Sequence, residues 1–279
     1  METYDFNYTY SELIDKIKSY KNSDFIYPNK RSSVSGSYDF TLTTSLEEAI
    51  KLATYGWQGS NAIKDIAYNL DNLIPVSQFK DTFLYDVSGD EPDITRYLAN
   101  EPENMLVFTQ EEDLDHKQVH LLVNCSYSGG IPTNIIYNRG AVIVTLINKL
   151  EDLGYRVKLD ICDISKSSSG ELIRILIQVK DYFEQTDIDR IAFCLCHPSF
   201  LRRILFSVYE SLPQNLVDEF KFYYGGDYGE PSDNLTGYSY TIYSSCVHYS
   251  SIGLYSTMDS CIRTVQSQIS EIIHKKNLY

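Results

Sequence analysis

Basic side chains are scarce in this sequence. Its 279 residues include 24 Lys and Arg against 38 Asp and Glu, which gives a formal net charge of −14 at pH 7. Neighbouring basic residues form short and scattered groups, at 29–31, 202–203 and 274–276. A surface of this average charge repels a phosphate backbone, so nucleic-acid binding is not expected and these groups are interpreted as solvated surface.

Long apolar runs are also missing. No run reaches the ~18 residues of a membrane-spanning helix, and the first residues, "METYDFNYTYSELIDKIKSY", contain acidic side chains and no apolar signal core. We therefore expect no membrane association and a cytoplasmic protein. Tryptophan occurs once but tyrosine 24 times, and tyrosine is enriched at protein interfaces. The composition thus favours protein partners, among them further copies of the chain.

The cysteines lack the Cys-x-x-Cys spacing of common zinc sites. The six are Cys125, Cys162, Cys194, Cys196, Cys246 and Cys261. Most lie in or beside apolar runs, and in a chain that is not secreted such thiols are most simply small buried hydrophobes.

One short segment, "CLCHP", nevertheless places Cys194, Cys196 and His197 within four residues. On a strand, Cys-x-Cys would direct both thiols to one face. Remote residues that could complete a zinc site are Cys162, Cys246 and His248. A pair of Cys194 or Cys196 with His248 could instead act as nucleophile and base. A simpler interpretation than the zinc site or the nucleophile pair is that both thiols are buried and that the histidine caps a helix.

The first part of the chain, residues 1–115, is expected to form an α+β region. Residues 11–20 have helical spacing. A helical hairpin is predicted at 45–73, in which Ser45 caps the first helix, Glu48 completes a capping box and Gly56 ends the helix. Two short strands are expected within 83–108, followed by an acidic loop that marks the boundary.

Residues 116–279 change to alternating strands and helices. Strands are predicted from Val119, at 155–162, at 171–179 and at 190–196, and helices at 138–153, 179–186, 198–212 and 256–276. This order predicts an α/β fold with a mostly parallel sheet flanked by helices.

A polar loop follows the strand at Val119, in "NCSYSGGIPTNIIYNRGA". Ligands of parallel sheets bind at the carboxyl ends of strands, so this loop is the first candidate site. It has no GxGxxG and no GK[ST], and it is long before the expected helix start at Asn138, which disfavours a phosphate-binding turn. The simplest role of Asn124, Ser126 and Ser128 is to satisfy loop backbone groups.

The same three residues, spaced i, i+2 and i+4, resemble the D-x-S-x-S motif of von Willebrand factor A domains. The Gly/Pro loop, helix, Gly154 and strand that follow resemble the cobaltochelatase-subunit-like branch of that fold. The resemblance implies a three-layer fold and a Mg²⁺ site, for which Ser126, Ser128 and Asp163 would be the ligands. Because Asn124 stands where the motif has Asp, the resemblance implies a degenerate domain, and no metal is expected between Ser126 and Ser128.

Four further stretches resemble a family of uncharacterised proteins from tailed bacteriophages and prophages. They are "SLEEAIKLATYGWQG", "DVSGDEPDITRYLANEPENM", "NCSYSGGIPTNIIYNRGA" and "INKLEDLGYRVKL". This resemblance implies a protein of the bacterial host cytoplasm or of the virion. The leading hypothesis is therefore a phage-type accessory or structural protein that acts through protein contacts and needs no cofactor.

The alternative is an enzyme or sensor that binds a nucleotide or another anionic small molecule at the loop 124–139. Its candidate ligand-binding residues are Asn124, Ser126, Ser128, Thr133, Asn138 and Arg139. Arg139 lies inside the predicted helix start, where it could bind an anion or pair with Asp160 or Asp163. Ser126 and Ser128 are expected to point toward that helix start. The acidic loop with Asp227, Glu230 and Asp233 is interpreted as a turn rather than as acid/base carboxylates.

Overall fold

The computed structural model describes residues 2–75, 84–89, 91–107, 118–127 and 130–276. Its strands are β1 Thr3–Thr9, β2 Leu84–Asp86, β3 Glu91–Pro92, β4 Met105–Val107, β5 Gln118–Asn124, β6 Arg156–Lys166, β7 Leu172–Lys180, β8 Glu230–Pro231 and β9 Ile242–Ser244. The α-helices are α1 Tyr10–Ser19, α2 Ser32–Ser35, α3 Tyr38–Thr41, α4 Leu46–Tyr55, α5 Ser60–Leu73, α6 Ile94–Leu98, α7 Thr133–Asp152, α8 Ile188–Cys196, α9 Phe206–Glu210, α10 Gln214–Glu219 and α11 Met258–Lys276. The described residues also form the 3-10 helices η1 Asn22–Asp24 and η5 Tyr249–Leu254 and the π-helix η4 Phe200–Leu205.

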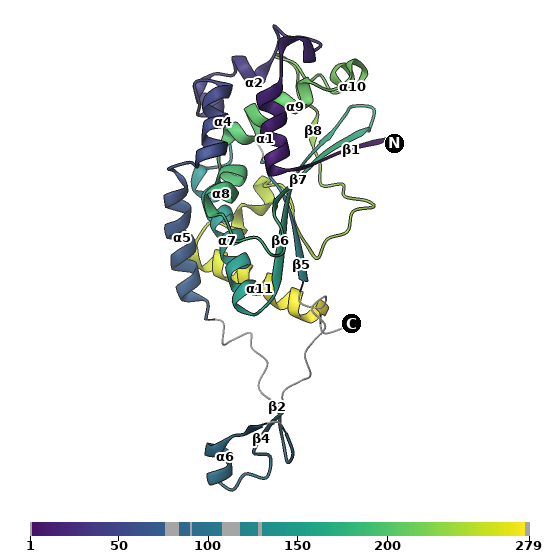
Figure 1. Cartoon of the computed structure of the whole chain (residues 1–279). Helices are drawn as coiled ribbons and strands as arrows, with labels where there is room; N and C mark the ends of the chain where they lie inside the picture. Colours follow the sequence, from purple (N-terminus) through teal and green to yellow (C-terminus); the bar gives the residue numbers. More distant parts are fainter. Residues whose placement is uncertain (1, 76–83, 90, 108–117, 128–129, 277–279) are drawn as a thin grey trace.

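The central sheet has the strand order β1-β7-β6-β5-β9, and β8 pairs with the end of β6. The pairs β1/β7, β5/β6 and β5/β9 are parallel, whereas β6/β7 and β6/β8 are antiparallel. The connection between β6 and β7, residues 167–171, is too short for a helical crossover, so these two strands form a hairpin. The predicted α/β fold, a mostly parallel sheet flanked by helices, is confirmed (Figure 1).

The main core lies between the sheet and its helices. Strand residues such as Leu121 and Ile161 pack there with Ile143 and Ile147 of α7. Figure 1 shows α5, α7 and α8 together on one side of the sheet. Gly140 lets α7 approach α8, because a Cβ at this position would lie 2.4 Å from the sulfur of Cys196. A smaller cluster occupies the opposite face and consists of Leu122, Cys162, Ile164, Leu172, Leu176 and Leu235.

The predicted helical hairpin is present as α4 and α5. The side chain of Ser45 accepts a hydrogen bond from the backbone N–H of Glu48, and Gly56 ends α4 with a φ of +93°. In a standard capping box the Glu48 carboxylate would accept from the backbone N–H of the N-cap residue, Ser45. Here it accepts instead from the backbone N–H and the hydroxyl of Thr44, one residue earlier. α5 packs on α7.

Segments from both predicted domains share one sheet. β1 pairs with β7 along its whole length, and the first buried residues of α1 belong to the same core as α7. The predicted domain boundary between residues 115 and 116 stays a prediction. Residues on both sides of it contribute to one hydrophobic core.

Three predicted elements differ from the structure. Residues 190–196 were expected to form a strand, but they belong to helix α8, whose N-terminus is capped by Asp187. Residues 179–186 were expected to form a helix, but β7 runs to Lys180 and a turn follows. The helix expected from Asn138 begins at Thr133, directly after Pro132. Proline preorganises a helix start because its φ is fixed and it lacks a backbone N–H.

Residues 84–107 form a small unit of their own. β2, β4 and β3 make an antiparallel sheet in that order, with α6 between β3 and β4. The sequence predicted only two strands here and no helix. In Figure 1 this unit lies apart from the central sheet, at the bottom of the view.

Within the described residues, no single helix is long and apolar enough to cross a membrane. Two consecutive helical segments, Ile188–Cys196 and Phe200–Glu210, are together long and apolar enough to cross a membrane, but the chain bends sharply between them. Residues 191–196 of this pair are all buried in the core, as is typical of a helix enclosed by its own protein.

Candidate functional site

The carboxyl ends of β5 and β9 lie side by side. From β5 the chain continues through α7 to β6 on one side, whereas β9 pairs with β5 on the other side. The pairing extends past both strands, since the backbone N–H of Val247 donates to the carbonyl of Ser126 over 3.1 Å. Polar loops that leave a parallel sheet at such a point commonly line a ligand site.

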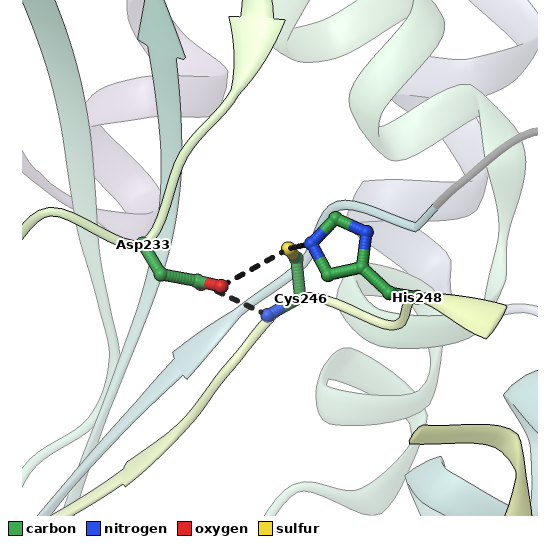
Figure 2. Close-up of side chains that lie close together, drawn as sticks. All are labelled: Asp233, Cys246 and His248. Atoms are coloured by element: carbon green, nitrogen blue, oxygen red, sulfur yellow. Dashed lines mark hydrogen bonds between the residues drawn. The ribbon is translucent and has the colours of Figure 1, made fainter. Parts of the chain in front are cut away.

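Cys246 and His248 follow β9 at this point. Because they are two residues apart in extended chain, their side chains lie on the same face. The sulfur of Cys246 is 2.8 Å from Nε2 of His248 and 3.3 Å from Oδ2 of Asp233. Figure 2 draws both contacts as dashed lines. The three potential ligand atoms all lie within 4.8 Å of one another. Cys246 is 1% exposed, whereas Asp233 and His248 are open to solvent.

Asp233 is positioned by contacts to three strands, β5, β6 and β9. The preceding residue, Ser232, donates its backbone N–H to Ile164 of β6 and accepts from the Asn124 amide of β5. Oδ1 of Asp233 accepts from the backbone N–H of Cys246 at 3.1 Å, from the Asn124 amide at 3.2 Å and from the Tyr243 hydroxyl. These three donors leave Oδ2 directed at the Cys246 sulfur. Such outer contacts orient the ligands of metal sites.

The surroundings of Cys246 disfavour a free thiolate. Burial and, after it, the Asp233 carboxylate raise the pKa of this thiol to about 12, and the nearby Arg139 guanidinium opposes the rise. A nucleophilic cysteine needs a lowered pKa and a base that is itself oriented. Here the carboxylate contacts the sulfur rather than the histidine, so Cys246 is neutral at pH 7 unless a cation compensates the charge.

Replacing Asp233 with asparagine is expected to lower the pKa of Cys246, because one negative charge beside the sulfur is removed. In metal-free protein at pH 9, alkylation of Cys246 should then become roughly threefold to tenfold faster. Peptide-resolved mass spectrometry after iodoacetamide treatment measures the rate. The matched control is Asp227→Asn, which changes an exposed carboxylate paired with Lys221. Equal rates in both variants would contradict the contribution of Asp233.

The three side chains together suit a borderline transition metal. Thiolate sulfur, imidazole nitrogen and carboxylate oxygen are all zinc ligands, and donors around a tetrahedral Zn²⁺ lie about 3.3–3.6 Å apart. The Cys246–His248 contact would have to open by several tenths of an ångström, which the exposed position of His248 permits. Mg²⁺ prefers oxygen ligands and fits this set poorly.

Asn124 and Ser126, predicted from the strand-end pattern, both lie at this edge. Asn124 contacts Asp233, as described above, and its side-chain oxygen accepts from the backbone N–H of Ser126 at 2.9 Å. The Ser126 hydroxyl was expected to point toward the start of the helix, but it donates to Asp163 of β6. Ser128 lies outside the described residues, so the expected absence of a metal between the two serines stays a prediction.

Both carboxylate oxygens of Asp163 accept hydrogen bonds from neighbouring side chains. One carboxylate oxygen accepts from Ser126 and the other from the Tyr209 hydroxyl at 2.5 Å. Burial raises the pKa of Asp163, against the lowering effect of these two hydrogen bonds. Each oxygen thus accepts one protein hydrogen bond, and the alternative Mg²⁺ site of Ser126, Ser128 and Asp163 stays a prediction, since Ser128 lies outside the described residues.

Arg139 is buried and directed at backbone carbonyls. Its guanidinium donates to the carbonyls of Asn124 at 2.8 Å and Ser245 at 3.0 Å, and to the Ser244 hydroxyl at 3.1 Å. These contacts join the ends of β5 and β9, so Arg139 fixes the backbone that carries Cys246. The alternative partners contact other groups: Oδ2 of Asp160 contacts His120, and Asp163 accepts from Ser126 and Tyr209.

The remaining predicted residues lie away from the cluster. Thr133 is the exposed first residue of α7, and the Asn138 amide donates to the Tyr255 carbonyl at 2.7 Å. Of the acidic loop, only Asp233 enters the cluster, because Asp227 pairs with Lys221 and Glu230 belongs to β8.

The "CLCHP" segment has a structural role. Cys196 contacts the Ile136 carbonyl at 3.4 Å, and Nδ1 of His197 lies 2.7 Å from the Ser199 hydroxyl. Burial lowers the pKa of His197 to about 4, which keeps its ring neutral. His197 is the C-cap residue of α8, in agreement with the simpler interpretation of buried thiols and a capping histidine. His248 pairs with Cys246 rather than with Cys194 or Cys196.

Residues 4–256 match the family described as "Domain of unknown function (DUF7192)". The chain belongs to this family. No curated protein and no solved structure matches it significantly. The Asp233, Cys246 and His248 side chains all fall within the DUF7192 match, so the cluster is part of the family domain rather than of an appended segment.

Proposed function

We propose that this DUF7192 protein binds a divalent transition metal, with Zn²⁺ as the best fit, through Asp233, Cys246 and His248. The observation that carries the proposal is the convergence of one carboxylate, one thiol and one imidazole within 4.8 Å at the carboxyl edge of the sheet. The three groups come from the segments that follow β8 and β9, and Asn124 of β5 fixes one of them.

Each ligand has a distinct contribution. Cys246 supplies a charged sulfur once the metal displaces its proton, and the metal reverses the effect of burial and of Asp233 on that proton. Asp233 supplies Oδ2, while its other oxygen stays hydrogen-bonded. His248 supplies Nε2 from an exposed position.

Three protein ligands are typical of zinc sites that keep a position for water or substrate, whereas structural sites use four. A metal bound in this way supplies Lewis acidity or a water of lowered pKa. Because Asp233 and His248 are exposed, a molecule from solution has access to that position.

Titration of metal-free protein with Zn²⁺, Co²⁺ and Mg²⁺ in a calorimeter tests the proposal. We expect one Zn²⁺ per chain, weaker binding of Co²⁺ and no measurable heat with Mg²⁺. The Co²⁺ complex should show the absorption of a thiolate-to-cobalt charge transfer. Absence of Zn²⁺ binding, or a Co²⁺ complex without thiolate absorption, would refute the site.

The two functions predicted from the sequence remain predictions. They are a phage-type accessory protein that acts through protein contacts, in the bacterial cytoplasm or the virion, and alternatively a site for an anionic small molecule at 124–139. The contacts of Arg139 weaken the second of these, since its guanidinium faces carbonyls of the protein.

A further inference from the structure

The small unit of residues 84–107 buries none of the side chains that the structure describes in it, which are those of 86–89 and 91–106. Its strands are two or three residues long and α6 has five residues. A segment of this size normally needs a disulfide, a metal or a partner to remain ordered, because its own apolar contacts do not offset the entropy of ordering.

α6 carries an apolar face directed to solvent. Ile94, Tyr97 and Leu98 are spaced i, i+3 and i+4, so they lie on one side of the helix. Their exposed fractions are 69%, 64% and 74%. Val87, in the connection after β2, is also 69% exposed. Anchors at this spacing are the usual means by which a helix enters a groove on another protein.

The same unit is strongly acidic. Residues 84–107 contain six Asp and Glu and one Arg, a formal charge of −5, which leaves −9 of the total −14 for the rest of the chain. The only basic side chain, Arg96, pairs with Glu101 at 2.5 Å. This charge repels partners that are themselves negative. Such partners are a second copy of this unit, the body of the chain, an anionic membrane and a nucleic acid.

From these observations we infer that residues 84–107 are a docking module for a basic amphipathic helix of a partner protein. The Ile94, Tyr97 and Leu98 side chains pack on the apolar face of that helix, and the surrounding carboxylates face its basic side chains. This inference is independent of the metal site, because it concerns different residues and a different part of the molecule.

The full-length protein and two synthetic helical peptides test the inference by fluorescence anisotropy. One peptide has leucines on one face and lysines on the other, and the second has serine in place of each leucine. We expect the leucine-containing peptide to bind roughly tenfold more tightly, and we expect Ile94→Ser/Leu98→Ser to abolish this difference. The matched control, Tyr68→Ser/Leu73→Ser, changes two exposed residues of α5 and should retain it.

A second variant tests the charge separately from the apolar face. Glu91→Gln/Glu103→Gln, at two exposed positions, should slow peptide association and reduce its dependence on NaCl. Unchanged peptide affinity in Ile94→Ser/Leu98→Ser would overturn the inference. So would a wild-type dimer in light scattering that this variant makes monomeric, since the occupant would then be a second copy.

Discussion

Replacing Cys246 with serine is expected to weaken Zn²⁺ binding by more than about 100-fold. Loss of an outer hydrogen-bond partner alone costs metal sites roughly 10–100-fold in affinity, and loss of a direct ligand costs more. Serine keeps the shape of the side chain but offers no thiolate at neutral pH. Calorimetry with Zn²⁺ measures the loss, and the Co²⁺ complex of this variant should lack thiolate absorption.

The control for this substitution is Cys261→Ser, a buried thiol of α11 outside the cluster. It should bind Zn²⁺ as the wild type does. His248→Ala should resemble Cys246→Ser, whereas Asn124→Ala should weaken binding by only about 10–100-fold, since Asn124 acts through Asp233. If Cys261→Ser and Cys246→Ser lose affinity equally, the metal is bound elsewhere.

The largest loss of stability is expected for Arg203→Met. Arg203 is fully buried in η4, and its guanidinium donates to the Thr43 hydroxyl at 2.6 Å and to the carbonyls of Thr43 and Ser33 at 2.8 and 2.9 Å. The carbonyls of Val34 and Gly36 also accept from it. Methionine fills much of the volume but leaves these acceptors unpaired. The free energy of unfolding should fall by about 3–5 kcal/mol.

Urea unfolding followed by circular dichroism measures this difference, and the neighbouring Arg202 provides the control. Arg202 is half-buried, lies over the ring of Phe40 and donates to the Phe40 carbonyl. Arg202→Met should cost less than about 1 kcal/mol, because its cation–π and hydrogen-bond contacts are open to water. Equal losses in the two variants would show that Arg203 does not secure residues 33–43.

Local signals in the sequence predict much of the fold. The hairpin of α4 and α5 follows from Ser45 and Gly56, and β5 follows from a run of apolar residues that ends at Asn124. Helix α8 is predicted wrongly because residues 191–196 are all buried. Where every side faces the core, no polar residue reveals the helical period, and a short apolar run also fits a strand.

The site is predicted only in part, for a different reason. Asn124 and Ser126 stand out because short polar residues follow an apolar strand. Asp233 and Cys246 are separated by irregular chain, and they meet only because β8 pairs with β6 and β9 pairs with β5. The one local signal is the Cys-x-His spacing of Cys246 and His248. This spacing indicates a metal site only when Asp233 is known to lie beside the two residues.

The pairing of β1 with β7 has a consequence for synthesis of the chain. Thr3 pairs with Leu172, so β1 has no partner during synthesis until roughly 170 more residues have followed it. At about 5–20 residues per second this takes roughly 10–30 s. An unpaired strand attracts other chains, but polar residues such as Asp5 and Asn7 alternate with aromatic ones in β1. The strand therefore presents a hydrated, partly charged face to solvent until the sheet that it completes has formed.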